Sequence, residues 1–290
     1  MNAPQHRDIR LPRLDRSIGA ILVDAGRLSA EDAERVLKLQ REREMRFGDA
    51  ALSLGLVSQA DIDFALARQF EYPYLVRGES PVDEELVAAY TPFSRVVERL
   101  RHTRSQLMLR WFGADTEQKT LAVVSPESGD GRSWLAANLA VVFSQLGERT
   151  LLIDADLRKP RQHTLFGIDN KQGLSAVLSG RGGPDAIKRI SSLLDLSVLP
   201  SGALPPNPQE LLARPIFSRL LAECASAFDV VLIDTPAAGE YADAHTISVR
   251  ASGALLLAQR NRSRASKLRS VSEELMQAGA TIVGAVLNER

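Results

Sequence analysis

A short run of small and charged residues, Ser125–Ser133 (SPESGDGRS), has the composition of a loop that binds phosphate. It follows an apolar run, Thr120–Val124, and precedes Trp134–Leu146, which has helical spacing. A strand, a glycine-containing loop and a helix in this order direct backbone N–H groups and a helix N-terminus at one anion. Gly129 and Gly131 allow the backbone to approach that anion without an intervening Cβ.

The loop differs in two places from the phosphate-loop pattern G-x-x-x-x-G-K-[ST]. Pro126 stands at the first glycine and Arg132 at the lysine, whereas Ser133 supplies the hydroxyl that binds Mg²⁺ in that pattern. Arg132 keeps the positive charge but replaces a compact ammonium with a wide planar fork. We expect Arg132 either to reach the phosphate oxygens or to crowd the loop. Taken alone, the loop is as compatible with an ordinary turn as with a nucleotide site.

Two further apolar runs end in carboxylates. Thr150–Ile153 is followed by Asp154 and Asp156, and Val230–Ile233 is followed by Asp234. Open α/β sheets bind their ligands at the carboxyl ends of the strands, and alternate residues of a strand face the same way. Asp154 and Asp156 are therefore predicted to converge on one Mg²⁺ or one hydroxyl, and Asp234 stands at a strand end where a Mg²⁺-binding carboxylate belongs. Together with the loop, they predict a nucleotide site.

Strand and helix patterns alternate through the rest of this region. Three further strands and three helical segments are expected: Leu196–Leu199, Gly253–Gln259 and Thr281–Leu287, and Asn207–Phe228, Tyr241–Val249 and Arg264–Ala278. This alternation predicts the α/β class, with a mostly parallel P-loop sheet covered by helices on both faces. Asn288 follows the last strand, where it could bond a base edge or serve as a turn residue.

The composition is typical of a globular protein, with 290 residues of which 25% are charged and 44% hydrophobic. Basic and acidic residues both number 36, so we expect no nucleic-acid partner. The single cysteine excludes an intramolecular disulfide framework. No segment resembles a signal peptide or a membrane span, so we expect a cytoplasmic protein. A local basic run is expected to be a solvated helix start: Arg260, Arg262, Arg264 and Lys267.

A tandem repeat of two copies of equal length, Ser17–Gln40 and Arg46–Gln69, follows a polar leader at 1–16. Each copy predicts two short helices that could bury a core only together. The residues that end the first helix of each copy are Gly26 and Gly55, and those that cap the second are Ser29 and Ser58.

This repeat resembles the N-terminal domain of type II secretion and pilus-assembly ATPases, in some of which the tandem motif binds cyclic di-GMP. By that resemblance, the residues that would contact cyclic di-GMP are Ile18, Gly19, Leu22, Arg46, Phe47 and Gly48. The arginine would face a guanine edge or a phosphate, and the apolar residues would pack on the base. The first copy has Ser17 in place of the motif's arginine, and a protein-docking module is the alternative.

A segment with prolines and a glycine, 73–92, predicts a linker between the repeat and the α/β region. The helix expected at 92–112 carries Glu98, Arg101 and Arg104 on one stripe. From the residues alone, that stripe is a solvated, salt-bridged face.

From about Phe93 onwards, the chain resembles the bacterial tyrosine kinases of capsule and exopolysaccharide synthesis, relatives of the ParA/MinD P-loop ATPases. The family's modified Walker A motif, S-x-x-x-G-x-G-K-[ST], corresponds to Ser125–Ser133. Its D-x-D-x-R motif corresponds to Leu151–Arg158 and its Walker B motif to Val230–Pro236. Its E-x-x-R-x-x-R motif, which docks subunits into a ring, matches the stripe on the 92–112 helix. We therefore expect that stripe to serve oligomerisation.

The resemblance implies ATP and Mg²⁺ as cofactors and assigns a role to each motif residue. Asp154 would accept the tyrosine proton, and Asp156 and Arg132 would complete the catalytic set. Ser133, Asp156 and Asp234 would hold the metal. The nucleotide would be bound by Ser128, Gly129, Asp130, Gly131, Arg132, Ser133, Trp134 and Asn288.

The expected function is that of a protein-tyrosine kinase, cytoplasmic but held at the inner membrane by a membrane chain-length regulator. The expected domains are the leader at 1–16, the helical repeat at 17–72, the linker at 73–92 and the kinase-like domain at 93–290. The sequence ends without the family's tyrosine-rich tail, so we expect no self-phosphorylation of a tail. Arg132 and the missing tail leave a non-catalytic ATP-dependent switch as the alternative. A DNA-segregating ATPase is disfavoured by the neutral charge.

Overall fold

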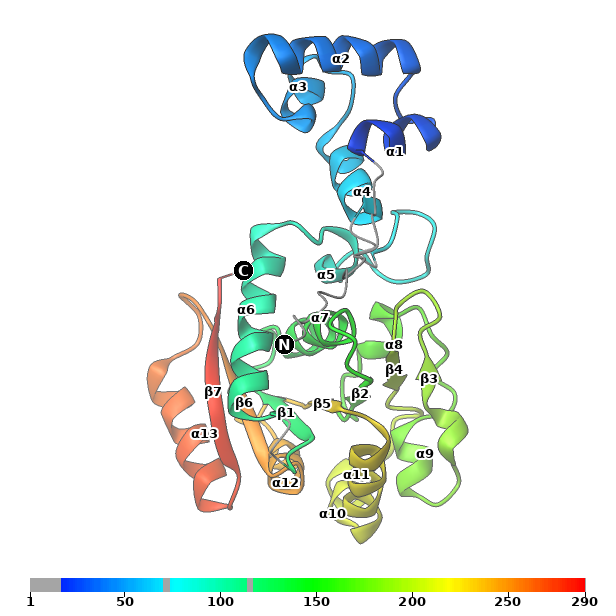
Figure 1. Cartoon of the computed structure of the whole chain (residues 1–290). Helices are drawn as coiled ribbons and strands as arrows, with labels where there is room; N and C mark the ends of the chain where they lie inside the picture. The colour runs from blue at the N-terminus through cyan, green and yellow to red at the C-terminus, as the bar shows by residue number, and fades with distance from the viewer. Residues whose placement is uncertain (1–16, 70–73, 114–116, 290) are drawn as a thin grey trace, which may run out of the picture. The chain divides into compact units, whose positions relative to one another are not determined.

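The computed structural model describes residues 17–69, 74–113 and 117–289. The chain divides into two compact units, Met1–Tyr72 and Pro73–Arg290, which we describe separately (Figure 1). The leader predicted at 1–16 lies outside the described residues. No helix in the described part of the chain is long and apolar enough to cross a membrane.

The first unit consists, in its described residues, of four helices: α1 (Ile18–Asp24), α2 (Ala30–Arg43), α3 (Phe47–Ser53) and α4 (Gln59–Gln69). Helix α1 packs against α4, and α2 packs against α3. The two copies of the repeat therefore exchange packing partners. Leu22, Val36, Ala51 and Ala65 are wholly buried in these contacts. Each copy forms two helices, as predicted.

The predicted helix ends of the repeat are confirmed. Gly26 and Gly55 adopt φ of +67° and +64°, a conformation that glycine takes without steric cost. The Ser29 side chain caps α2 by accepting the backbone N–H three residues on, at 3.0 Å. Ser58 and Asp61 form a reciprocal capping box, in which the Ser58 N–H donates to Asp61 at 2.9 Å and the Asp61 N–H donates to Ser58 at 3.3 Å.

The second unit contains a seven-stranded sheet in the order β3-β4-β2-β5-β1-β6-β7. The strands are β1 (Thr120–Val124), β2 (Thr150–Asp154), β3 (Lys188–Arg189), β4 (Leu196–Leu199), β5 (Val230–Asp234), β6 (Gly253–Gln259) and β7 (Thr281–Asn288). Every neighbouring pair is parallel except β3–β4. The predicted, mostly parallel α/β sheet is confirmed, and the two-residue β3 at its edge was not anticipated.

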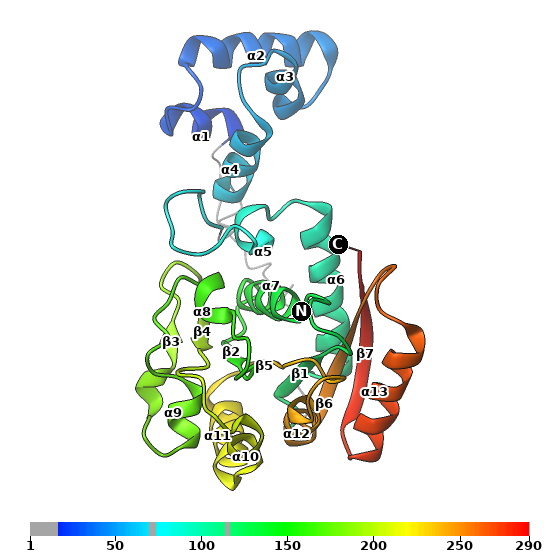
Figure 2. The same cartoon turned by 180° about the vertical axis from the view of Figure 1, so that it is seen from behind.

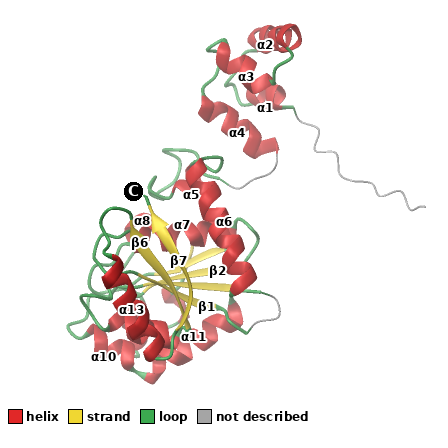
Figure 3. Ribbon diagram, turned by 90° about the vertical axis from the view of Figure 1, so that its left-hand side faces the viewer, coloured by secondary structure: helices red, strands yellow, loops and turns green. Residues whose placement is uncertain are grey.

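Helices cover both faces of this sheet (Figures 2 and 3). One face packs against α5 (Val87–Tyr90), α6 (Arg95–Arg110), α7 (Arg132–Ser144) and α8 (Gln162–Leu165). The other packs against α9 (Leu174–Leu178), α10 (Pro208–Ala213), α11 (Pro215–Ala227), α12 (Asp243–Arg250) and α13 (Ala265–Gln277), with a short 3₁₀ turn, η1 (Pro184–Ala186). Alternate strand residues supply the two cores, so Val123 faces one layer and Val124 the other.

The helix predicted at 207–228 is interrupted, because Pro215 begins α11. Arg214 before it has φ −66° and ψ 146°, an extended conformation that steric contact with the proline ring favours. The helical spacing of apolar residues continues across this break, so only the proline indicates it in the sequence.

The segment predicted as a linker, 73–92, packs into the core of the second unit over its described residues. Leu86 and Ala88 are fully buried against α7. The Ala88 N–H donates to the Asn138 side chain at 3.0 Å, and the Trp134 indole donates to the Glu85 carbonyl at 2.8 Å. This segment differs from a solvated linker because its apolar residues cover the outer face of α7.

Candidate nucleotide site

The predicted phosphate loop connects β1 to the first residue of α7. Its glycines have φ of +83° at Gly129 and +102° at Gly131. A Cβ at Gly131 would lie 2.6 Å from Nδ2 of Asn288, so a larger residue would have to displace that side chain and adopt a strained φ. The loop is therefore built for close approach of another group to its backbone.

Arg132 points into the body of the unit rather than into solvent. Its Nε donates to the Thr235 carbonyl at 2.8 Å, and its Nη1 donates to the Glu127 carbonyl at 2.6 Å and to Oγ of Ser125. The residue is buried. No acceptor among the described residues takes a hydrogen bond from Nη2. The protein bonds of Arg132 are therefore made by Nε and Nη1.

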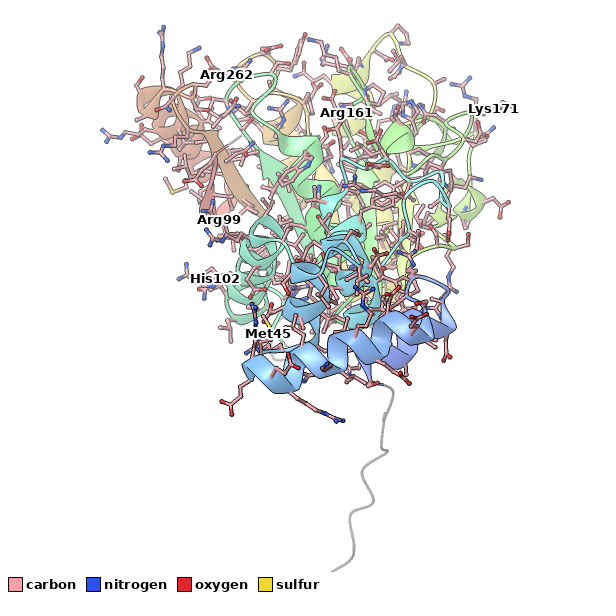
Figure 4. All side chains as sticks on the ribbon, turned by 90° about the horizontal axis from the view of Figure 1, so that it is seen from above. Met45, Arg99, His102, Arg161, Lys171 and Arg262 are labelled. Carbon is pink, nitrogen blue, oxygen red and sulfur yellow. The ribbon has the colours of Figure 1, made fainter. Side chains whose placement is uncertain are left out.

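Three side chains from the segment after β6 hold the loop from outside; we call them the clasp: Arg262, Ser263 and Lys267. Arg262 is labelled in Figure 4. Its guanidinium lies 3.2 Å from the Ser128 carbonyl and 3.3 Å from the Gly129 carbonyl. Oγ of Ser263 donates to Asp130 at 2.9 Å, and Lys267 forms an ion pair with Glu127. Arg262 and Lys267 are exposed around the start of α13, as predicted, but both also contact the loop, which the sequence did not indicate.

Two residues predicted to contact the nucleotide stabilise the loop itself. The Asp130 carboxylate is fully buried and accepts the Glu127 N–H at 2.9 Å. The Asn288 side chain donates to the Asp130 carbonyl at 3.0 Å, which joins the end of β7 to the loop. The sequence pattern placed Asp130 in the loop and Asn288 at the end of the last strand, but it did not predict that both side chains support the loop.

The two acidic strand ends lie side by side. Asp154 and Asp234 are in register on β2 and β5, and both are fully buried. One oxygen of Asp154 accepts the backbone N–H groups of Arg161 at 3.2 Å and Gln162 at 2.9 Å. Oδ2 of Asp234 accepts Nε2 of Gln162 at 2.8 Å, and the Ser133 hydroxyl also bonds this carboxylate. The remaining Oδ1 of each carboxylate is buried without a donor among the described residues.

Burial makes the negative charges of this pair costly. It raises the pKa of Asp154 well above its usual value, and the neighbouring Asp234 charge adds to the effect. Burial also raises the pKa of Asp234, to about 6, against the opposing hydrogen bonds from Ser133 and Gln162. A bound cation would remove most of this cost.

Asp156 lies beside the pair with a different set of contacts. Its Oδ1 accepts the N–H groups of Arg158 at 3.1 Å and Lys159 at 2.8 Å, which closes the turn after β2. Arg158 in turn pairs with Asp243 at 2.6 Å and stacks on the Tyr241 ring at 3.9 Å. The D-x-D-x-R motif is thus anchored to the start of α12.

The donor set fits a hydrated Mg²⁺. No three His, Cys, Asp or Glu side chains in the described ranges are grouped as a metal cage. The unpaired, buried oxygens of Asp154 and Asp234 beside the Ser133 hydroxyl are instead suited to an ion that keeps water and phosphate ligands.

A cavity of about 330 Å³ lies next to the phosphate loop, between α6, the start of α7 and the end of β7. Its walls include Leu100, Trp134, Leu135, Leu287 and Asn288. Trp134 and Asn288, predicted as nucleotide contacts, therefore face a common space. The walls are mostly apolar, and Arg99, Thr103, Asn288 and Glu289 supply the polar part of the lining, which suits a flat, polar-rimmed group.

The predicted oligomerisation stripe lies on α6. Glu98 is exposed and pairs with Arg101 at 3.2 Å. Arg104 donates to the Val142 carbonyl at 2.8 Å, so it contacts α7 of its own chain.

The structure brings together the starts of both repeat copies. The Phe47 ring lies against Gly19, where a Cβ would be 2.9 Å from it. Leu22 is wholly buried, Ile18 and Gly48 are half-buried, and Arg46 is exposed at the N-terminus of α3.

Sequence reasoning missed Gln162 and Thr235. Gln162 bonds both strand-end carboxylates, and the Thr235 carbonyl holds Arg132. No motif marks Gln162, although Thr235 directly follows the Walker B aspartate.

Comparison with known proteins agrees with this geometry. Residues 121–290, more than half of the chain, match the CobQ/CobB/MinD/ParA nucleotide binding domain. The tyrosine-protein kinase YwqD of Bacillus subtilis is 35% identical over 209 residues, 72% of this chain and 87% of that protein. The putative tyrosine-protein kinase CapB of Staphylococcus aureus is 35% identical over 68% of this chain and 86% of its own.

A solved structure, the kinase domain of the Escherichia coli tyrosine kinase ETK, matches with a TM-score of 0.67 and 31% identity. The match covers 70% of this chain and 79% of that one. With the phosphate loop, the paired strand-end carboxylates and the parallel sheet in place, the chain belongs to the CobQ/CobB/MinD/ParA nucleotide-binding family and, within it, to the bacterial tyrosine kinases.

Proposed function

We propose that this protein is an ATP-dependent protein-tyrosine kinase of exopolysaccharide synthesis. The observation that carries the proposal is the register of Asp154 with Asp234 beside the phosphate loop. It unites a candidate proton acceptor, a candidate metal ligand and the Ser133 hydroxyl in one buried site. The cavity lined by Trp134 and Asn288 would hold the nucleotide base.

Catalysis would consist mainly of positioning and charge neutralisation. Mg²⁺, held by Ser133, Asp234 and the free oxygen of Asp156, would neutralise the phosphate charge. Backbone N–H groups of the loop and Nη2 of Arg132 would hold the phosphates. The tyrosine oxygen attacks the γ-phosphorus, the bond to the bridging oxygen of ADP breaks, and the phenolic proton passes to Asp154. Its Oδ1 is suited to this step because no protein donor occupies it.

The test is phosphotransfer by the full chain with Mg-ATP and the cytoplasmic segment of a membrane chain-length regulator. Phosphotyrosine detected by mass spectrometry, and lost in Asp154→Asn, is the expected result. Complete absence of phosphotyrosine with wild-type protein would refute the proposal. In the cell we expect this partner to hold the kinase at the inner membrane.

A non-catalytic ATP-dependent switch is the second candidate, favoured by the contacts of Arg132. Its Nε and Nη1 are bound to Thr235, Glu127 and Ser125, so part of its charge is directed away from the phosphates. If these bonds alone prevent transfer, Arg132→Lys should raise phosphotransfer from an undetectable level. An Arg132→Lys protein that binds Mg-ATP and still transfers no phosphate would argue against this explanation.

Self-association through the α6 stripe would assemble the kinase into a ring. Glu98 is exposed enough to meet a neighbouring subunit. We expect Glu98→Lys to lower the molar mass measured by light scattering, whereas Glu240→Lys, an exposed site outside the stripe, should leave it unchanged.

Cyclic di-GMP would act through the first unit. The contact of Gly19 with Phe47 lies between the starts of the two copies, and the exposed Arg46 is adjacent in sequence. Calorimetry with the full chain should show binding that Arg46→Ala weakens. No heat with wild-type protein at tens of micromolar ligand would leave protein docking as the role of this unit.

A further inference from the structure

The Gln162 side chain lies between the strand-end carboxylates and the start of α7. It is fully buried, and its Nε2 donates to Oδ2 of Asp234 at 2.8 Å and to the Ser133 carbonyl at 3.1 Å. Its backbone N–H donates to Asp154 at 2.9 Å. One residue therefore fixes both carboxylates relative to the first turn of α7.

Three oxygens at this place lack a donor among the described residues: Oδ1 of Asp154, Oδ1 of Asp234 and Oε1 of Gln162. A buried acceptor without a donor costs free energy of about 1–3 kcal/mol. Native proteins retain such atoms where a ligand or an ordered water supplies the missing partner. With both carboxyls ionised, all three atoms are acceptors, so the missing partner is a cation or its water shell and not an anion.

A glutamine with a purely structural role would use both ends of its amide. Here only the N–H end is bonded, and the oxygen is left free beside two carboxylates. A third carboxylate at this position would increase the repulsion within the buried pair. The amide supplies an oxygen without adding that negative charge.

We propose that Gln162 is a positioning residue for the divalent cation of this site. Nε2 fixes Asp234, and Oε1 accepts a hydrogen bond from the water shell of the ion. The inference rests on the proposed function for the identity of the site. Mg²⁺ keeps several waters in such sites, and groups that orient its ligands change metal affinity about 10–100-fold.

The test is a Mn²⁺ titration of the full chain followed by electron paramagnetic resonance, with ADP present. Gln162→Met keeps the length of the side chain and removes both polar atoms. We expect it to weaken Mn²⁺ binding about tenfold or more, while ADP affinity in EDTA stays within about twofold. Gln162→Leu also removes both polar atoms and should weaken Mn²⁺ binding to a similar extent. Gln172→Met, at an exposed position, is the matched control and should behave like wild type.

Wild-type Mn²⁺ affinity in a folded Gln162→Met protein would overturn the inference, and so would a wild-type chain that binds no Mn²⁺. If Gln162→Met does not fold, wild-type Mn²⁺ affinity in a folded Gln162→Leu protein overturns it instead. The titration measures Mn²⁺ binding and is independent of phosphotransfer. A protein that needs Gln162 for Mn²⁺ but forms no phosphotyrosine refutes the kinase and leaves this inference standing.

Discussion

The phosphate loop and the carboxylate pair lie next to each other, yet they differ in how completely the protein satisfies the hydrogen bonds of their polar groups. In the loop, Arg132, Asp130 and Asn288 all bond to protein atoms. At the strand ends, Asp154 and Asp234 each keep one buried oxygen without a donor. The loop is therefore held in shape before a ligand arrives, whereas the carboxylates are incomplete without one.

This difference predicts opposite effects of substitution in the two regions. Removing a bonded polar group should destabilise the fold, because its partners become unpaired. Removing an unpaired buried charge should stabilise the ligand-free fold and weaken ligand binding. Stability measured without metal and nucleotide is the quantity that separates the two cases.

The largest effect on stability is expected from Arg132→Met. The substitution leaves the Thr235 and Glu127 carbonyls and the Ser125 hydroxyl without their donor. We expect the free energy of unfolding to fall by about 2–3 kcal/mol, measured by urea denaturation. Arg132→Lys, which restores one donor group, should recover part of the loss. An unchanged midpoint for Arg132→Met would mean that water replaces the guanidinium, and the loop would not be held by it.

The opposite sign is expected for Asp234→Asn. Burial raises the pKa of Asp234 from 3.8 to about 6, so the folded chain binds its proton more tightly than the unfolded chain does. Stability of the wild type therefore falls as the pH rises from about 4 to about 6, and the full cost is present above that range. The asparagine variant should gain about 1–2 kcal/mol at pH 8 in EDTA.

Thermal unfolding at pH 8 and pH 5 checks this prediction. The gain in Tm for Asp234→Asn should shrink at pH 5, because the wild-type carboxyl is then protonated. The same variant should lose Mg²⁺-dependent nucleotide binding. A lower Tm than wild type at pH 8 would show that the hydrogen bonds from Ser133 and Gln162 outweigh the cost of burial.

The sequence predicted the parts of this site that depend on order along the chain. Apolar runs gave the strands of the sheet centre, and the carboxylates that follow them met at one edge because parallel strands end together. The helix ends of the repeat followed from glycine and serine at fixed spacing. In each case, local chemistry and the fold specify the same outcome.

The parts that escaped prediction depend on contacts between distant segments. Gln162 reaches Asp234, and Arg262 reaches Gly129, only because of how the sheet brings separate loops together. Neither the spacing of apolar residues nor a sequence motif indicates such contacts between distant segments. The prolines and the glycine of the 73–92 segment predict a linker. The contact of this segment with α7 cannot be recognised from its own composition.

The smallest effect is expected at the clasp, where the contacts are exposed. Arg262 bonds two loop carbonyls near solvent, so Arg262→Ala should cost about 0.5 kcal/mol or less in stability. The loop would nevertheless sample more conformations, and we expect nucleotide affinity to fall about two- to fivefold by calorimetry. Arg269→Ala, an equally charged and exposed change on α13, is the control and should leave affinity unchanged. Equal losses of nucleotide affinity in both variants would mean that the loss of positive charge, and not the loss of the clasp contact, causes the effect. The shape of the loop would then depend on Arg132, Asp130 and Asn288 alone.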